Sequence, residues 1–467
     1  MFNKFACRVI VFSLLFCTAA APFAAAAQNI GAPQREQLLN GLPIIFLPQP
    51  GDPSVLLKLR INSGAAFDLA GKEGMMQILS AALFPDPTTR QYVAEELGGR
   101  LDVTTTYDTI DITLAGKATE FERLVGLLRN AVVNLRLAEA EIARLREEQI
   151  KRAEDLSQQP AQIADRAAVS RLYGAHPYGR LLTGTPETLA RFERADLLLA
   201  RDRFIHPNNS TLVLIGGVER SRAMRAFRQF LGAWRKSDAI VPASFRQPEA
   251  PGARTLLVNQ PGAETVEVRL ALRGLSRADR DLAAARLLAS IVQNRWHAAL
   301  NAAPPLTVNV RHDAHTLSGL FLLSAAVPGN AAARAVEAAQ GILPVLAAAP
   351  VTSAELEKAK AAALAHINTR KSQNFTEFLA DQWLDAASYV LPANYDEAQA
   401  INSVTPADVQ RVATQLFQNA PMASVVVGDA AQLRDSLAKL ANGFETPDAK
   451  PAAPPAPTSS ALPIKRP

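Results

Sequence analysis

The chain has 467 residues, of which 48% are hydrophobic and 20% charged, so its length suits two to four globular domains. Its 49 Lys and Arg residues are nearly balanced by 44 Asp and Glu residues, and a net charge of +5 gives no reason to expect nucleic acid or an acidic membrane surface as a partner. Both cysteines, Cys7 and Cys17, precede residue 28, so the rest of the chain can form neither a disulfide nor a thiolate metal site.

Residues 1–27 have the pattern of a secretory signal peptide. Lys4 and Arg8 precede the apolar stretch "VIVFSLLF", and the small residues "AAAPFAAAA" follow it, as a cleavage site requires. The apolar stretch is too short to anchor the chain in a membrane. Lipidation at Cys17 is the alternative, although Phe16 stands where lipoprotein signals have a small residue. We expect a periplasmic or secreted protein with no membrane span after cleavage.

An internal duplication sets the expected architecture. The segment "QPGDPSVLLKLRI" at 49–61 matches "QPGAETVEVRLAL" at 260–272, and both alternate apolar and polar residues like a half-buried strand. Likewise, "RADLLLARDRFIHPNNSTLVLIGG" from Arg194 matches "PADVQRVATQLFQNAPMASVVVGD" from Pro406. Because the spacing is nearly constant, 211 and then 212 residues, we predict two copies of one α+β domain, each a mainly antiparallel sheet packed with helices.

The duplication and the local composition divide the chain into five parts. A Pro-, Ala- and charge-rich stretch is typical of a linker between the two copies, and the Pro/Ala-rich C-terminal tail is too poor in apolar residues to bury a core, so we expect it to be disordered. The predicted parts are the signal peptide 1–27, the N-terminal domain 28–235, the linker 236–253, the C-terminal domain 254–445 and the tail 446–467.

The segment "GMMQILSAALFP" at 74–85 is an apolar run that follows the first duplicated strand. Its apolar residues have the spacing of a helix packed on a sheet: Met75, Ile78, Leu79, Ala82 and Leu83. Within it, only Gln77 and Ser80 have side chains that hydrogen-bond well. Since no His or Lys lies close to Ser80 in the sequence, we interpret it as a hydrogen-bonded core serine and not as a nucleophile.

Several segments in a fixed order resemble the pitrilysin/insulinase family of zinc metallopeptidases, especially two-domain members akin to mitochondrial processing peptidase. The matching segments are "NSGAAFDLAGKEG" before the apolar helix, "ELGGRLDVTTTYDTIDITLAG" after it, "LYGAHPYGR" at 172–180, "HPNNSTLVLIGG" at 206–217, "AELEKAKAAALAHI" at 354–367 and "INSVTPADVQRVATQLF" at 401–417. The resemblance extends over most of residues 28–467 and implies the LuxS/processing-peptidase-like fold of this family.

In that family the apolar helix carries His-x-x-Glu-His, whose two His bind zinc and whose Glu is the general base. The resemblance places Gln77 and Ala81 at the two His positions and Ser80 at the Glu position. None of these side chains can do the work of the residue it replaces. We therefore predict no catalytic residue and no zinc in this chain, although active relatives require zinc.

The third zinc ligand of the family is a Glu on a later helix, and the resemblance places Lys151 or Arg152 there. The register leaves Glu147, Glu148 and Glu154 as alternatives. Six histidines after the signal peptide are scattered: His176, His206, His297, His312, His315 and His366. The closest pair, His312 and His315, falls in a predicted strand, where residues three apart face opposite sides, so we do not expect a relocated metal site.

In active relatives the C-terminal half supplies an Arg and a Tyr that hold the peptide substrate. At the corresponding positions this chain has Asn301 and Val308, with Pro304 and Pro305 between them. Arg295 and Trp296 could contact a peptide or a partner, but a solvent-facing arginine and a core tryptophan are the favoured interpretation. The substrate site is thus predicted to be degenerate as well.

These features predict a non-catalytic subunit, a pseudo-peptidase that pairs with an active zinc metallopeptidase, or with a second copy of itself, around unfolded peptides. One alternative is a stand-alone scaffold that binds extended peptides by β-strand addition. Another is an active zinc metalloendopeptidase with atypical ligands. No nucleic acid partner is expected.

Overall fold

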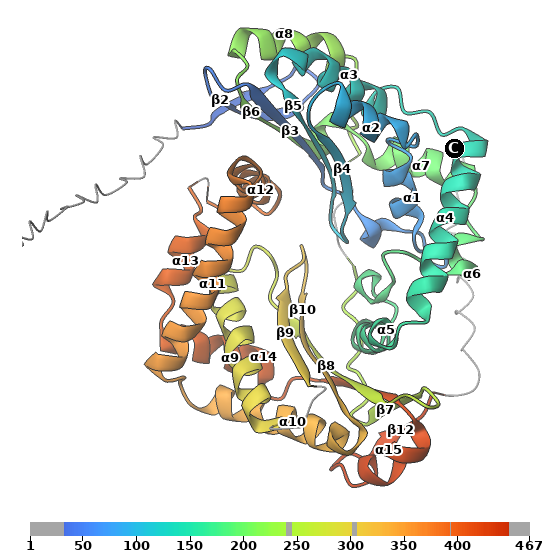
Figure 1. The fold of residues 1–467 in the computed structure, drawn as a ribbon, viewed down its shortest axis with the longest axis vertical. Coiled ribbons are helices and arrows are strands. Elements are labelled where there is room, and N and C mark those ends of the chain that lie inside the picture. Colours follow the sequence, from blue (N-terminus) through green and yellow to red (C-terminus); the bar gives the residue numbers. More distant parts are fainter. Residues whose placement is uncertain (1–31, 240–244, 301–305, 393, 448–467) are drawn as a thin grey trace, which may run out of the picture.

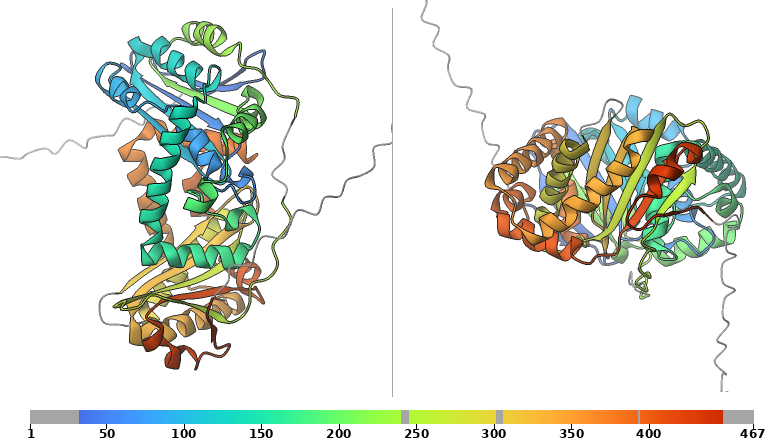
Figure 2. Two further views of the ribbon diagram at one scale, coloured as in Figure 1. Left: turned by 90° about the vertical axis from the view of Figure 1, so that its right-hand side faces the viewer. Right: turned by 90° about the horizontal axis from the view of Figure 1, so that it is seen from below.

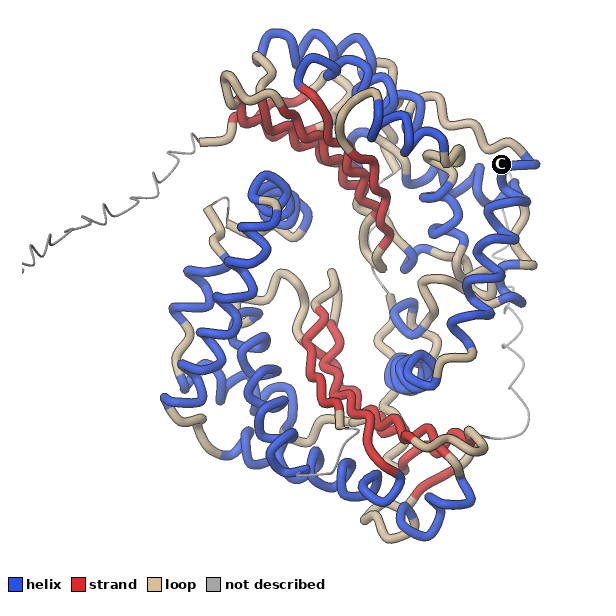
Figure 3. Tube along the Cα trace, viewed as in Figure 1, coloured by secondary structure: helices blue, strands red, loops and turns tan. Residues whose placement is uncertain are grey.

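The computed structural model describes residues 32–239, 245–300, 306–392 and 394–447. The predicted signal peptide with Cys17, position Asn301, and residues 448–467 of the predicted tail lie outside this range. Two six-stranded sheets face each other, and most helices cover their outer faces (Figures 1 and 3). Among the described residues no single helix is long and apolar enough to cross a membrane, and one helix pair, bent by 109°, passes that test jointly.

The first sheet has the strand order β1-β2-β6-β3-β5-β4. Neighbouring strands are antiparallel except β2 and β6, which are parallel. Its strands are β1 Gln34–Gln37, β2 Pro43–Pro48, β3 Ser54–Ile61, β4 Arg100–Thr105, β5 Ile110–Lys117 and β6 Ser210–Gly216.

The second sheet repeats this order as β7-β11-β8-β10-β9, with β12 added beside β7. The pair β7–β11 is parallel, as β2–β6 is, and β12 also runs parallel to β7. Its strands are β7 Thr255–Asn259, β8 Thr265–Gly274, β9 Thr307–Asp313, β10 Gly319–Pro328, β11 Ala423–Gly428 and β12 Phe444–Glu445. The predicted fold class, two duplicated and mainly antiparallel α+β units, is confirmed.

The helices also follow the duplication, since α3 and α10 begin at equivalent points after β5 and β10. The first half contains α1 Met75–Ala81, α2 Thr88–Glu95, α3 Phe121–Val132, α4 Glu139–Ser157, α5 Pro160–Tyr173, α6 Pro186–Leu189, α7 Arg194–Phe204 and α8 Arg220–Leu231. The second contains α9 Leu282–Leu300, α10 Ala332–Ala348, α11 Ser353–Gln373, α12 Phe375–Ser388, α13 Glu397–Ser403, α14 Pro406–Phe417 and α15 Ala430–Leu437.

Side-chain alternation along β3 separates the two faces of the first sheet. Val55, Leu57 and Leu59 point outward into the core that β3 shares with the helices of the same half. Lys58 lies between Leu57 and Leu59, and Arg60 follows Leu59. The side chains of Lys58 and Arg60 point to the inner face, toward the other half. Each inner face therefore needs a cover that its own half does not provide.

The two halves exchange one helix each to supply this cover. Ala164, Ala168 and Leu172 of α5 share a buried cluster with β8, β10 and β11 of the second sheet. In return, Ala380 and Leu384 of α12 share a buried cluster with β2, β3 and β6 of the first sheet. Figures 1 and 2 show both exchanged helices lying between the sheets. The halves are thus interlocked and do not merely touch at an edge.

A buried cation anchors each exchanged helix. Lys58 of β3 pairs with Asp381 of α12, and Arg269 of β8 pairs with Asp165 of α5. Lys58 and Arg269 are 211 residues apart, the spacing of the duplicated strands, so they are equivalent positions. Both cations are almost fully buried, and such groups are tolerated only when they are paired. The same polar contact has therefore been kept in both halves.

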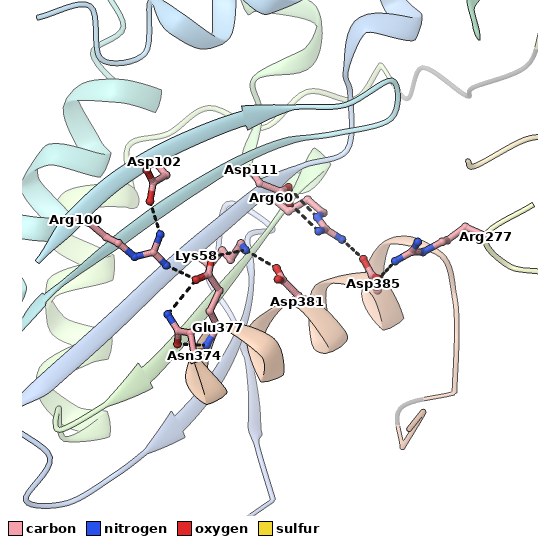
Figure 4. A network of polar contacts seen from close by, with 10 residues as sticks. All are labelled: Lys58, Arg60, Arg100, Asp102, Asp111, Arg277, Asn374, Glu377, Asp381 and Asp385. Atoms are coloured by element: carbon pink, nitrogen blue, oxygen red, sulfur yellow. Dashed lines mark hydrogen bonds and ion pairs between the residues drawn. The ribbon is translucent and has the colours of Figure 1, made fainter. Parts of the chain in front are cut away.

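The ion pairs on α12 extend into a network (Figure 4). Arg60 donates to both carboxylate oxygens of Asp111, at 2.8 and 2.7 Å, and to Asp385 of α12 at 2.7 Å. Asp385 also pairs with Arg277 of the second half. Burial opposes ionisation of Asp385, but Arg277 and Arg60 hold the pKa of its carboxyl below the usual range. Asp385 is therefore the anion shared by one cation from each half, the buried Arg60 and the half-buried Arg277.

We predict that Asp385→Ala destabilises the protein by about 2–3 kcal/mol, because it removes charge-assisted hydrogen bonds from the buried Arg60, which keeps Asp111, and from the half-buried Arg277. Urea unfolding monitored by circular dichroism would measure the loss. The matched control is Asp102→Ala, which removes an exposed carboxylate paired with Arg100 and should cost less than about 1 kcal/mol. Equal effects of the two substitutions would contradict the prediction.

Candidate functional site

The helix α1 carries the positions that correspond to the zinc motif. It is shorter than the sequence suggested, since it ends at Ala81, four residues before Pro85. Met76 and Leu79 are fully buried, whereas Gln77 and Ala81, one turn apart, are only half-buried. Residues at i and i+4 lie on the same face of a helix, so the structure brings Gln77 and Ala81 to one side, as the resemblance implied.

The N-terminus of α1 is held by the carboxylate of Asp68. Its two oxygens accept from the backbone N–H groups of Gly74 at 2.8 Å and Met76 at 2.7 Å, which have no partner within the helix. Gly74 has φ +92°, and a Cβ there would lie 2.8 Å from the carbonyl oxygen of Thr183, so glycine is required. Burial of Asp68 outweighs these hydrogen bonds and raises the pKa of the carboxyl to about 7.

Ser80 stands at the general-base position and is hydrogen-bonded on both sides. Its Oγ donates to the carbonyl oxygen of Gln77 at 2.8 Å and accepts from Oγ1 of Thr105 on β4 at 2.6 Å. The side chain is buried, and no His or Lys takes part in these contacts. A hydroxyl held in this way ties α1 to the edge strand β4 and has no base to activate it.

The register predicted for the third ligand is not supported. Lys151 and Arg152 are exposed on α4, and so are the alternatives Glu147, Glu148 and Glu154. The buried stripe of α4 consists of Ile142, Leu145, Gln149 and Ala153.

Gln149 is the polar residue of that stripe. Its Nε2 donates to the carbonyl oxygen of Thr183 at 3.0 Å, the same oxygen that a Cβ on Gly74 would approach. Gln149 therefore lies beside the N-terminal end of α1, where a third ligand from α4 would be expected. The helical spacing of Gln149 from Leu145 and Ala153 was the signal in the sequence that could have identified it.

The positions in the second half are equally unsuited to hold a substrate. Val308 is half-buried and packs against the hydrophobic core of its own half. Arg295 makes two hydrogen bonds to the carboxylate of Glu355, at 2.7 and 3.0 Å. Trp296 is fully buried and donates its Nε1–H to the carbonyl oxygen of Ala335 at 3.0 Å. Arg295 and Trp296 thus have structural partners.

Three histidines, His176, His312 and His315, have structural contacts, and the rings of His176 and His315 both pack against Tyr178. His312 lies in β9, but that strand ends at Asp313, so His315 belongs to the following connection and not to the predicted strand. Nε2 of His312 accepts from the backbone N–H of Leu275 at 2.8 Å, and burial lowers its pKa to about 3. His176 accepts from the backbone N–H of Tyr178 through Nδ1.

The donor set around α1 does not fit a catalytic zinc ion. Zinc in such sites has three His, Asp, Glu or Cys ligands, whereas the facing positions here are the amides of Gln77 and Gln149 and the methyl group of Ala81. Within the described parts of the chain, no group of three or more His, Cys, Asp or Glu residues could hold a metal ion. The arrangement can therefore support packing but offers no zinc-bound water and no general base.

Two family descriptions match the chain. Residues 44–186 match Insulinase (Peptidase family M16), and residues 191–363 match Peptidase M16 inactive domain. The first of these ranges contains all of α1, α4 and α5, and the second runs from α7 of the first half into α11 of the second half.

Similar proteins agree with these matches. A zinc protease of Rickettsia bellii, described as uncharacterized, is 22% identical over 194 residues, which cover 40% of this chain and 47% of that protein. The mitochondrial-processing peptidase subunit beta of Neurospora crassa is 20% identical over 293 residues, covering 61% of this chain and 60% of the subunit. The chain thus spans 47% and 60% of the length of these two relatives. A crystal structure of a peptidase M16 inactive domain from Pseudomonas fluorescens superposes with a TM-score of 0.74 at 20% identity, covering 85% of this chain and 98% of that one.

If Gln149 occupies the third-ligand position, zinc binding can be restored there and not at Arg152. We predict that Gln77→His, Ala81→His and Gln149→Glu together bind zinc at least about tenfold more tightly than the same two histidines with Arg152→Glu. Competition with a chromophoric chelator would measure both affinities. Equal affinities, or a tighter site with Arg152→Glu, would show that the register derived from the structure is wrong.

The raised pKa of Asp68 predicts a pH-dependent stability. Between about pH 4 and pH 7 the folded state keeps the Asp68 proton while the unfolded state, with a pKa near 3.8, has lost it, so stability falls as the pH rises. A shift of this size corresponds to up to about 4 kcal/mol. Measured by urea unfolding, the difference between the unaltered protein and Asp68→Asn should therefore decrease from pH 4 to pH 7 and level off above it. A pH-independent difference would contradict this assignment.

Proposed function

The chain belongs to the insulinase family of peptidases, peptidase family M16, and we propose that it is a non-catalytic member, an exported pseudo-peptidase that pairs with an active zinc peptidase. The observation that carries this proposal is the set of side chains at the zinc and general-base positions: Gln77, Ser80, Ala81 and Gln149. Losing even an outer partner of a metal ligand typically costs ten- to a hundredfold in affinity or activity, so losing all three ligands removes the chemistry.

The interior of the chain supports an association role. The exchanged helices α5 and α12 fill the inner faces of the two sheets. One cavity lined by both halves, between residues 105–107 and residues 311–315, has a volume of about 420 Å³, which suits a small ligand better than a polypeptide. A chamber that encloses an unfolded peptide would therefore require a second chain. We propose that this protein forms one wall of such a chamber.

The N-terminal sequence and the similar proteins are both consistent with this role. The pattern of residues 1–27 directs the chain to the periplasm or the exterior, where an unfolded peptide substrate would be met. Relatives named as a zinc protease and as a processing-peptidase subunit are the class from which an active partner would come.

A pull-down from the native envelope fraction tests the proposal. We expect the protein to co-purify with a chain that contains His-x-x-Glu-His, and the pair to have chelator-sensitive peptidase activity. The isolated protein should contain less than about 0.1 zinc per chain, because zinc sites need three or four clustered His, Cys, Asp or Glu ligands and the described residues contain no such cluster. Gln77→Ala should leave the activity of the pair unchanged, whereas a His→Ala change in the partner's motif should abolish it.

Other outcomes would contradict the proposal in distinguishable ways. Near-stoichiometric zinc with chelator-sensitive cleavage by the isolated protein would make it an enzyme with atypical ligands. A stable monomer that ignores such a partner but binds extended peptides would make it a stand-alone scaffold, for which an edge strand such as β9 offers unpaired backbone groups.

A further inference from the structure

A mostly apolar cavity of about 650 Å³ lies on the side of α5 that faces α4 and β7. We call it the α5 groove. Its volume is in the range of sites that bind drug-sized ligands, so it can hold a few side chains of a bound segment. The lining residues that matter here are Leu156, Ile163, Arg166, Ala167, Leu256 and Val258.

The chain itself runs into the α5 groove at its C-terminal end. β12 pairs in parallel with β7, with Phe444 opposite Thr255 and Glu445 opposite Leu256. Continued for two residues, this register brings Pro447 beside Val258, and both residues line the groove. Pro447 has no N–H group to extend the ladder, which explains why the pairing ends and the chain turns into the groove.

An ion pair fixes the point of entry. Arg171 of α5 pairs with Glu445 at 2.6 Å and donates to the carbonyl oxygens of Gly252 and Arg254 at 3.2 and 2.8 Å. The last residues of β12 and the end of the linker are therefore both tied to the same helix.

Arg166 lies further back along α5, toward its N-terminus, and it also lines the α5 groove. It is exposed and makes no ion pair with any described residue. Five helical residues separate Arg171 from Arg166, a rise of about 7.5 Å. The sequence after Pro447 begins with Asp448, which three extended residues, spanning up to about 10 Å, separate from Glu445. Asp448 can therefore reach Arg166, which lines the groove and has no ion-pair partner among the described residues.

We propose that residues 448–457, "DAKPAAPPAP", dock in the α5 groove of their own chain, with Asp448 paired to Arg166 and the prolines against Leu156 and Ile163. A proline-rich segment prefers the extended polyproline II conformation and loses little entropy when it binds an apolar groove. Because the segment is covalently attached at the mouth of the groove, its effective concentration there is high.

Disulfide trapping tests this directly, since the chain from Gln28 onward has no cysteine. We expect Ala452→Cys with Ile163→Cys to form a disulfide at least about tenfold faster than Ala452→Cys with Lys439→Cys. Lys439 is exposed at the end of the α15 region, beside β7 but outside the groove, so a tail that does not dock would reach it equally well. Equal rates, or a faster reaction with Lys439→Cys, would overturn the proposal.

Charge reversal and a peptide in trans provide a second readout. Arg166→Glu should slow trapping several-fold, and Asp448→Lys in the same chain should restore it, whereas Arg152→Glu on the exposed face of α4 should have no effect. A labelled peptide of residues 447–467 should bind saturably, by fluorescence anisotropy, to the chain ending at Pro447 but not to the full chain. No binding to the shortened chain, or equal binding of a scrambled peptide, would show that the groove does not recognise this segment.

Discussion

The exchange of α5 and α12 between the halves is the constraint on which the rest of the structure depends. Lys58 and Arg269, equivalent positions in the duplicated strands, place a charge on the inner face of each sheet. A buried cation without a partner would be costly, and each sheet receives from the opposite half a helix that carries an acidic partner, Asp381 on α12 or Asp165 on α5. The same requirement explains the cluster at one end of α12. There, Arg60 and Arg277 share a single carboxylate, that of Asp385.

The sequence predicted the fold because the fold depends on local patterns, and the assignment of Gln77, Ser80 and Ala81 to the zinc-motif positions rests on the same kind of pattern. The duplicated strands alternate with period 2, and α1 keeps its apolar spacing even though Gln77, Ser80 and Ala81 have replaced the motif. The sequence left the third-ligand position open because α4 is rich in charged residues, several of which could be aligned with a glutamate. Only the packing of α4 on α1 shows that Gln149, between Leu145 and Ala153, faces inward.

The exchanged helices could not be predicted in the same way. Glu377, Asp381 and Asp385 are four residues apart on α12, and such an acidic stripe would normally be assigned to the solvent-exposed face of a helix. In the folded protein it is directed at Lys58, Arg60 and Arg277. Whether this charged face is buried or exposed depends on contacts with a strand more than three hundred residues away in the sequence. The periodicity of α12 alone cannot indicate such a contact.

The exchange of helices also determines the order in which the chain can mature. α5 is made with the first half but completes the second sheet, and α12 emerges after most of the second half yet completes the first sheet. The first sheet must therefore wait, with Lys58 and its apolar neighbours uncovered, until residue 388 has been synthesised. Such long-range contacts slow folding and prolong the exposure of apolar surface. Neither half can thus cover its own sheet, and the two halves reach their final packing only after both exchanged helices have been synthesised.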